Sequence, residues 1–205
     1  MRKYLVILTL TACFLLHVNG FAQGRRTSLF IGASSYFPVE DNIHQGYGSS
    51  LGLSILTTRK VTFSVRWDYG RYPVDKEEGK LLNGTIYITP VLASVHYSLI
   101  NNSSFSPYVF LGAGLVGANF QIGERETPED QEVREQKIKN GFGLHGGIGI
   151  IFRMKGRVSL YAETGFIRSE TTVTTTYETL LGTRQEEFSQ KLSSYKVTAG
   201  IIMYF

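Results

Sequence analysis

Apolar and polar residues alternate with a period of two along most of this chain, in eight separate segments. Successive side chains of a β-strand point to opposite faces, so each segment predicts a strand with one apolar and one polar face. The segments cover residues 27–36, 47–57, 60–72, 85–99, 107–121, 141–154, 157–171 and 193–205. The chain is therefore predicted to be all-β.

The connections between these segments alternate in length. The short or modest turns are residues 58–59, 100–106 and 155–156, and the long polar stretches are residues 37–46, 73–84, 122–140 and 172–192. In an antiparallel arrangement all the short turns fall at one end and all the long loops at the other. This pattern predicts an eight-stranded up-and-down barrel, whose interior is only just wide enough for side chains.

The two faces of the predicted strands indicate which side of the barrel meets lipid. In the third segment the apolar face carries Val65 and Trp67, and the opposite face carries Arg66. A soluble ligand-binding barrel needs an apolar interior, so this distribution favours a transmembrane barrel, with a soluble one as the alternative. Buried charges are costly unless they are paired or hydrated. The residues expected to point inward and pair across the lumen are Arg66, Asp68, His96, His145, Arg153, Glu163 and Lys196.

The final strand, Tyr195 to Phe205, ends on an aromatic residue. It resembles the closing strand of bacterial outer-membrane barrels, which the barrel-assembly machinery reads. That signal contains a polar residue, a glycine two positions later and two terminal hydrophobic or aromatic residues. Thr198, Gly200, Met203 and Phe205 match this spacing, with Met203 in place of the usual aromatic residue. These four residues are the predicted assembly signal.

The amino terminus has the pattern of a secretory leader. Arg2 and Lys3 precede an apolar run over residues 4–16, and small residues then lead to a predicted cleavage after Ala22. This divides the chain into a signal peptide, residues 1–22, and a barrel domain, residues 23–205. A lipoprotein reading, in which Cys13 is acylated, is the alternative. The apolar run continues past Cys13, which favours the ordinary leader.

Composition narrows the remaining classes of function. The formal charge of +4 would fall to +2 if Arg2 and Lys3 left with the leader, so we expect no nucleic-acid partner. Cys13 is the single cysteine, so a mature chain would contain no disulfide and no reactive thiol. After the leader no run approaches the roughly 18 apolar residues of a transmembrane helix. Export without helical spans favours the outer membrane.

The whole of residues 27–205 resembles the family of small eight-stranded outer-membrane barrels that includes the OmpA transmembrane domain and the OmpX-like adhesin and evasion proteins. Residues 106–120 (SPYVFLGAGLVGANF) are similar to a fifth strand of that group, and the leader resembles those of Bacteroidota. The resemblance implies an integral barrel of a Gram-negative outer membrane with both termini periplasmic. Its expected partners are outer-membrane lipid, lipopolysaccharide and the assembly machinery. The resemblance does not imply one particular job.

One cluster has a catalytic pattern. His96 and Ser98 resemble the histidine and serine of lipid A deacylases, in which the histidine activates the serine. Those enzymes follow the serine with an asparagine, where this chain has Leu99, and they carry an acidic partner that is missing around Phe110. We therefore predict no enzyme and no catalytic residue. A lipid A-type hydrolase using His96 and Ser98 is the alternative.

The stretch of residues 122–140 mixes acidic and basic residues. Its carboxylates could bind divalent cations, but no EF-hand spacing is present. A mixed-sign run is more typical of a solvated loop, or of a short helix with an i,i+4 pair such as Glu135 and Lys139. No metal site and no cofactor are predicted.

The seventh strand continues past the length that a membrane requires. Period two runs from Arg157 through Thr176, in a stretch that extends to Thr179, whereas a tilted crossing needs about 9–11 residues. A turn at Leu181 and Gly182 would create a two-stranded blade above the membrane, whose exposed edge invites pairing with a partner strand. The predicted function is therefore surface or protein interaction through the outer loops, especially residues 172–192. A narrow channel and an accessory subunit of an outer-membrane secretion or transport complex are alternatives.

Overall fold

The computed structural model describes residues 27–76, 81–100, 104–123, 133–154, 156–179 and 182–205. The predicted leader, including Cys13, lies outside the described residues. Within them, no helix is long and apolar enough to cross a membrane. Ten strands are present: β1 (Thr27–Pro38), β2 (Gly46–Leu56), β3 (Val61–Val74), β4 (Gly84–Ser98), β5 (Phe105–Ile122), β6 (Val133–Ile138), β7 (Gly141–Arg153), β8 (Val158–Thr179), β9 (Gly182–Lys191) and β10 (Ser194–Tyr204).

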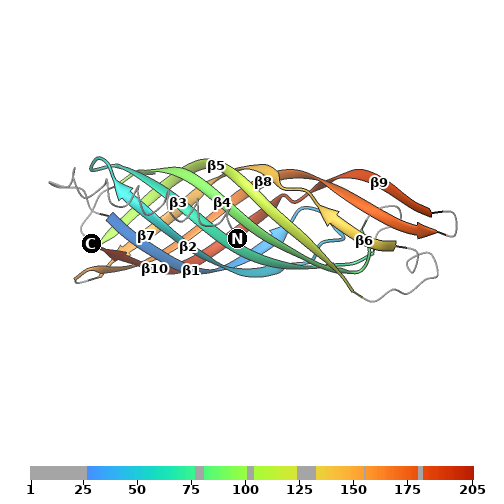
Figure 1. The fold of residues 1–205 in the computed structure, drawn as a ribbon. Helices are drawn as coiled ribbons and strands as arrows, with labels where there is room; N and C mark the ends of the chain where they lie inside the picture. Colours follow the sequence, from blue (N-terminus) through green and yellow to red (C-terminus); the bar gives the residue numbers. More distant parts are fainter. Residues whose placement is uncertain (1–26, 77–80, 101–103, 124–132, 155, 180–181) are drawn as a thin grey trace.

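Eight of these strands close into an antiparallel ring, in the order β1, β2, β3, β4, β5, β7, β8 and β10 (Figure 1). The first and last strands complete it, because β1 pairs with β10 from Ser28 and Tyr204 to Pro38 and Ser194. The predicted eight-stranded up-and-down barrel is confirmed. The carboxyl terminus also returns to the start of β1, since the Phe205 amide donates to the Thr27 carbonyl at 2.9 Å.

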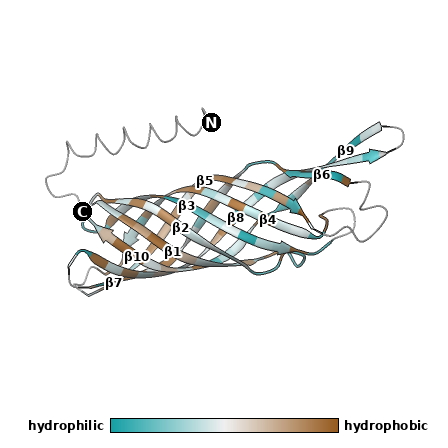
Figure 2. Ribbon diagram, turned by 60° about the horizontal axis from the view of Figure 1, so that its bottom comes forward, coloured by the Kyte–Doolittle hydropathy of each residue, from teal (hydrophilic) through white to brown (hydrophobic). Residues whose placement is uncertain are grey.

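Side chains alternate between the two sides of this wall as the sequence predicts. Leu160 is 46% exposed on the outside of β8, while its neighbour Ser159 is 1% exposed on the inside. The same outward exposure of large apolar residues recurs around the ring, at Phe63, Val65, Trp67, Leu111, Leu115, Leu144, Ile148 and Ile201. Figure 2 shows hydrophobic residues concentrated over the part of the ring nearer the carboxyl terminus. We call this surface the apolar belt.

The inside of the barrel is not polar throughout. Towards the end that carries β6 and β9, the lumen holds a buried apolar cluster that includes Tyr36, Ile86, Leu92 and Val173. Leu81, from the connection between β3 and β4, is completely buried in the same cluster. We call it the apolar layer. The polar faces expected from the sequence therefore do not line this half of the lumen, where residues before β4 fold inward among apolar neighbours.

Beyond the ring, β8 continues between two further strands. Along one side, β8 first pairs with β10, and the last pair is Ile167 with Ser194. The same side then pairs with β9 in the same register, from Glu170 opposite Lys191 to Thr179 opposite Gly182. On its other side β8 pairs with β6. We call this three-stranded extension, formed by β8 from Glu170 onward with β6 and β9, the blade. Figure 1 shows it at the end opposite the carboxyl terminus.

The strand β6 corrects the expectation of a loop or short helix in residues 122–140. Val133–Ile138 instead occupies the edge that β8 presents where its pairing with β7 ends. Glu135 forms its ion pair with Lys137 at 2.7 Å and not with Lys139, which binds Glu187 at 2.8 Å. Residues 124–132, which hold the other acidic positions of that stretch, lie outside the described residues.

Candidate functional sites

Two buried ion pairs cross the lumen on the polar side of the apolar layer. Arg66 on β3 binds Glu163 on β8, and Lys196 on β10 lies 2.6 Å from Asp68 on β3. The phenol of Tyr108 donates a further hydrogen bond to Glu163 at 3.0 Å. All four charged side chains are almost fully buried, so each charge depends on its partner. We call these four residues the ionic layer.

A chain of hydroxyl groups ties the ionic layer to the strands that close the ring. Lys196 Nζ donates to Ser50 at 3.0 Å, and Ser50 bonds to Ser34 at 3.0 Å. Ser34 is also 2.9 Å from Thr198 on β10. Side chains from β10, β1, β2 and β3 are therefore joined in one hydrogen-bonded network, which fixes the closure of the barrel from inside.

The two predicted lumen histidines lie beside this network and bind serines. His145 Nε2 is 3.0 Å from Ser94, and His96 Nε2 is 2.8 Å from Ser64. The ring of Phe110 lies against both imidazoles, with centroid distances of 5.5 Å. This packing leaves a cavity of about 50 Å³, room for a few water molecules. The lumen at this level is filled by side chains.

The histidine and serine of the hydrolase alternative do not form a dyad. His96 is hydrogen-bonded to Ser64, while Ser98 lies at the end of β4 on the wall of the small cavity. The nearby carboxylate of Glu163 accepts hydrogen bonds from Arg66 and Tyr108. Arg153, expected in the lumen, is exposed as the last residue of β7.

The four residues of the predicted assembly signal have different environments. Thr198 is buried and bonded to Ser34. A Cβ at Gly200 would lie 2.1 Å from the Ile31 carbonyl oxygen, so packing alone excludes other residues there. Met203 is half-buried, and Phe205 is 72% exposed. Packing therefore accounts for Thr198 and Gly200 but not for Phe205, whose recognition by the assembly machinery stays a prediction.

The blade presents a polar outer face. Thr172, Thr174 and Thr176 follow one another along this face of β8. Lys139 and Glu187 meet over it at 2.8 Å, and Thr174 donates to the same carboxylate at 3.2 Å. The hydrogen bond and the positive charge of Lys139 lower the pKa of Glu187 below its ordinary value. The face is thus ordered by cross-strand contacts, although it is open to solvent.

The free edge of the blade is the outer edge of β9. Leu192, just past β9, donates its amide to Ser169 of β8, whereas the Ser193 carbonyl accepts from Val39 on the opposite side. The backbone N–H and C=O groups of successive residues in an antiparallel strand point to opposite sides. The groups that point away from β8 are therefore those of Thr183, Gln185, Glu187, Ser189 and Lys191. Among the described residues no strand pairs with that edge. The backbone donors and acceptors of Thr183, Gln185, Glu187 and Ser189 therefore face an edge that no described strand occupies, while the Lys191 carbonyl accepts from the Gln190 side chain at 3.2 Å.

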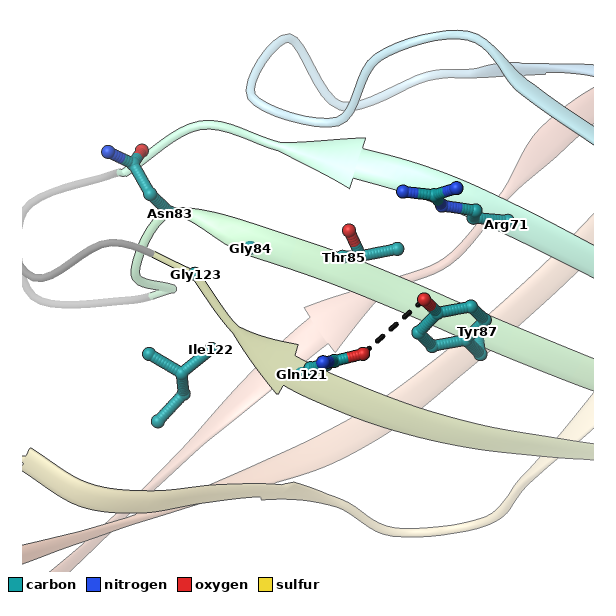
Figure 3. Close-up of a pocket in the computed structure, with 8 residues that line it drawn as sticks. All are labelled: Arg71, Asn83, Gly84, Thr85, Tyr87, Gln121, Ile122 and Gly123. Atoms are coloured by element: carbon teal, nitrogen blue, oxygen red, sulfur yellow. Dashed lines mark hydrogen bonds between the residues drawn. The ribbon is translucent and has the colours of Figure 1, made fainter.

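A separate groove lies on the outside of the wall (Figure 3). It has a volume of about 440 Å³ and is lined by residues of β3, β4 and β5 and by the residues next to the ends of β4 and β5: Arg71, Asn83, Gly84, Thr85, Tyr87, Gln121, Ile122 and Gly123. The Tyr87 phenol donates to the Gln121 side-chain carbonyl at 3.4 Å, and the Tyr87 ring lies 6.3 Å from that of Tyr69. Sequence reasoning missed this groove, because its residues come together only through the register of three strands.

The chain is similar to solved barrels of bacterial outer membranes. It aligns with OprG from Pseudomonas aeruginosa with a TM-score of 0.73 and 14% identity, covering 88% of this chain and 95% of OprG. With neisserial surface protein A the TM-score is 0.56 at 15% identity, and the alignment covers 89% of this chain and 98% of that protein. With a major outer membrane protein from Thermus thermophilus the TM-score is 0.54 at 15% identity, and the alignment covers 89% of this chain and 100% of that protein.

The fold is that of the small outer-membrane β-barrels. At these identities the likeness concerns the fold alone. No family model matches the chain, and no curated protein matches it.

Proposed function

We propose that this protein is an integral outer-membrane barrel without catalytic activity, and that its blade binds a protein partner at the cell surface. The apolar belt supports the membrane placement, since bulky apolar side chains on the outside of a ring are stable in lipid and costly in water. The blade and the belt lie at different levels of the barrel (Figure 2). In this placement the blade is extracellular and both chain ends are periplasmic.

The proposed binding role rests on one observation, the unpaired edge of β9. An exposed strand edge is a template for a further strand, and its main-chain groups supply the affinity. The edge is a direct extension of the barrel wall, because β9 pairs with β8 in the same register as β10 does. The proposed partner is an extended polypeptide segment that adds a strand beside Gln185 and Glu187.

The filled lumen argues against conduction as the main role. The ionic layer and the apolar layer occupy successive levels of the interior, and the cavity beside the ionic layer measures only about 50 Å³. The barrel then serves as an anchor that holds the blade. An accessory subunit of a secretion or transport complex fits the same design, with a partner in the outer membrane in place of an extracellular one.

The test removes the outward backbone donors of β9 while leaving its pairing with β8. Gln185→Pro with Glu187→Pro deletes two amides of the free edge, a position where proline is tolerated in sheets. The control carries Gln185→Ala with Glu187→Ala and keeps both amides. A photo-crosslinking residue at Ser189 reports contact in intact membranes. We expect the wild type and the alanine control to crosslink a partner and the proline variant to lose it. Equal crosslinking by all three would contradict strand addition.

A further inference from the structure

The groove in Figure 3 lies where the outer wall changes from apolar to polar. Along the outside of β3, Val65 and Trp67 are followed by Tyr69 and then by Arg71, all exposed. Tryptophan and tyrosine gather where a membrane meets water, so Arg71, the next outward residue after Tyr69, stands at the level of lipid headgroups. If the barrel spans the membrane as proposed above, the groove faces outer-leaflet headgroups and not bulk solvent.

Neighbouring strands make the same change at the same end. On β4 the outward residues pass from Val91 to Tyr87 and Thr85, and on β5 they pass from Leu115 to Gln121. Three strands therefore contribute polar groups to one concavity directly beyond the apolar belt. Its volume of about 440 Å³ lies within the range of roughly 300–1,000 Å³ typical of small-molecule sites.

The polar groups of the groove are mainly hydrogen-bond donors. Arg71 offers a planar guanidinium with no acceptor, and it forms no ion pair with any described residue. The Gln121 carbonyl already accepts from Tyr87, so its amide nitrogen is left to donate. None of the eight lining residues is acidic. A site with this character suits an anion with several oxygen atoms, and guanidinium groups bind phosphates with two parallel hydrogen bonds.

We propose that the groove binds the phosphorylated sugar headgroup of an outer-leaflet lipid. Arg71 binds the phosphate, while Gln121 and Thr85 bind the remaining headgroup oxygens and the acyl chains lie along the apolar belt below. This site is separate from the free edge of the blade. It gives the barrel a fixed lipid neighbour beside β3, β4 and β5.

The experiment is native mass spectrometry of the full chain in detergent, titrated with bisphosphorylated lipid A. Arg71→Gln should weaken binding about tenfold, the loss typical of a hydrogen-bonded contact with a charged group. The control is Arg168→Gln, since Arg168 is also an exposed arginine on the outer wall but lies outside the groove. It should bind as the wild type does. Equal weakening by both variants would show general charge attraction and overturn the proposal.

Two further arms identify the ligand. Lipid A stripped of phosphate should bind the wild type about as weakly as intact lipid A binds Arg71→Gln; equal binding of both lipids overturns the phosphate contact. Inorganic phosphate should displace the lipid only at far higher concentration, and displacement at matched concentration overturns the lipid source. If Arg71→Gln does not fold, Gln121→Ala provides the same comparison, with a smaller expected loss. A variant with a shortened blade should keep full lipid binding, which separates this result from the fate of the proposed partner.

Discussion

The strand β8 passes through two surroundings, and comparing its two halves shows what each demands. Between Val158 and Ile167 it pairs with β7 and β10, and beyond Glu170 it pairs with β6 and β9. The inner face stays buried in both halves, with Glu163 at 5% and Val173 at 0% exposure. The outer face changes from Leu160 to threonines at positions 172, 174 and 176. The apolar face is suited to lipid and the threonine face to water, although β8 pairs with antiparallel strands in both halves.

The largest expected contrast lies between charges in the two halves. Glu163→Ala should destabilise the barrel by about 3–5 kcal/mol, because it leaves Arg66 buried without a partner. Glu187→Ala in the blade should not change stability measurably, because its ion pair with Lys139 is exposed to solvent. Urea unfolding in detergent micelles measures both. A small effect of Glu163→Ala would show that the ionic layer does not support the fold.

A second contrast places the same new charge on the outer face of each half. Leu160→Arg should cost about 2–4 kcal/mol if the side chain faces lipid near the midplane. Thr172→Arg, on the same face of the same strand, should change stability by no more than about 0.5 kcal/mol, as surface substitutions usually do. Folding yields in liposomes compare them. Equal penalties would mean that the belt does not meet lipid.

Shortening the blade tests whether the two halves are independent. Removing residues 174–187 and joining Val173 to Phe188 through Asn-Gly keeps both residues beside the apolar layer. The barrel should retain its heat-modifiable gel shift and nearly all its stability, because the pairings of β8 with β7 and β10 lie outside the deleted residues. Partner crosslinking should be lost. Unfolding of the shortened chain would show that the blade is part of the folding unit.

The smallest predicted effect concerns pH. Because the pKa of Glu187 is lowered in the folded protein, its contact with Lys139 stabilises the blade at pH values above the ordinary glutamate pKa. This stabilisation is lost as the pH falls through the lower pKa of the folded state. Lys139→Met should return the Glu187 pKa towards the usual value of about 4.3. Carboxyl NMR titration of both proteins measures it. An unchanged pKa in the variant would mean that Lys139 does not order the blade.

The eight barrel strands were predictable because lipid outside and charge inside enforce strict alternation along residues such as Ser64, Val65 and Arg66. The strand β6 was not predicted, because a register shift between Val133 and Glu135 breaks that alternation. Its buried residues, Val133, Gln136 and Ile138, are consequently not spaced by two throughout. The mixed charges around them suggested a helix instead.

The interior was only partly predictable for a related reason. Arg66, Asp68, Glu163 and Lys196 could be assigned inward from strand parity, but their pairing depends on the register across the ring. The apolar layer left one signal in the sequence, since Ile86, Ile88 and Leu92 occupy the same face of β4 as the polar Ser94. The sequence contains no signal for the burial of Leu81, because the residues of a loop between strands do not follow a two-residue period.

The proposed surface role depends most directly on which side of the membrane the blade and the opposite end of β8 reach. Single cysteines replace Gln185 in the blade and Arg157 at the opposite end, in a chain whose one natural cysteine is Cys13. A membrane-impermeant maleimide is then added to intact cells and to permeabilised cells. We expect Gln185→Cys to be labelled in intact cells and Arg157→Cys to be labelled only after permeabilisation. Labelling of Arg157→Cys in intact cells, with Gln185→Cys protected, would invert the barrel and contradict the proposed surface role of the blade.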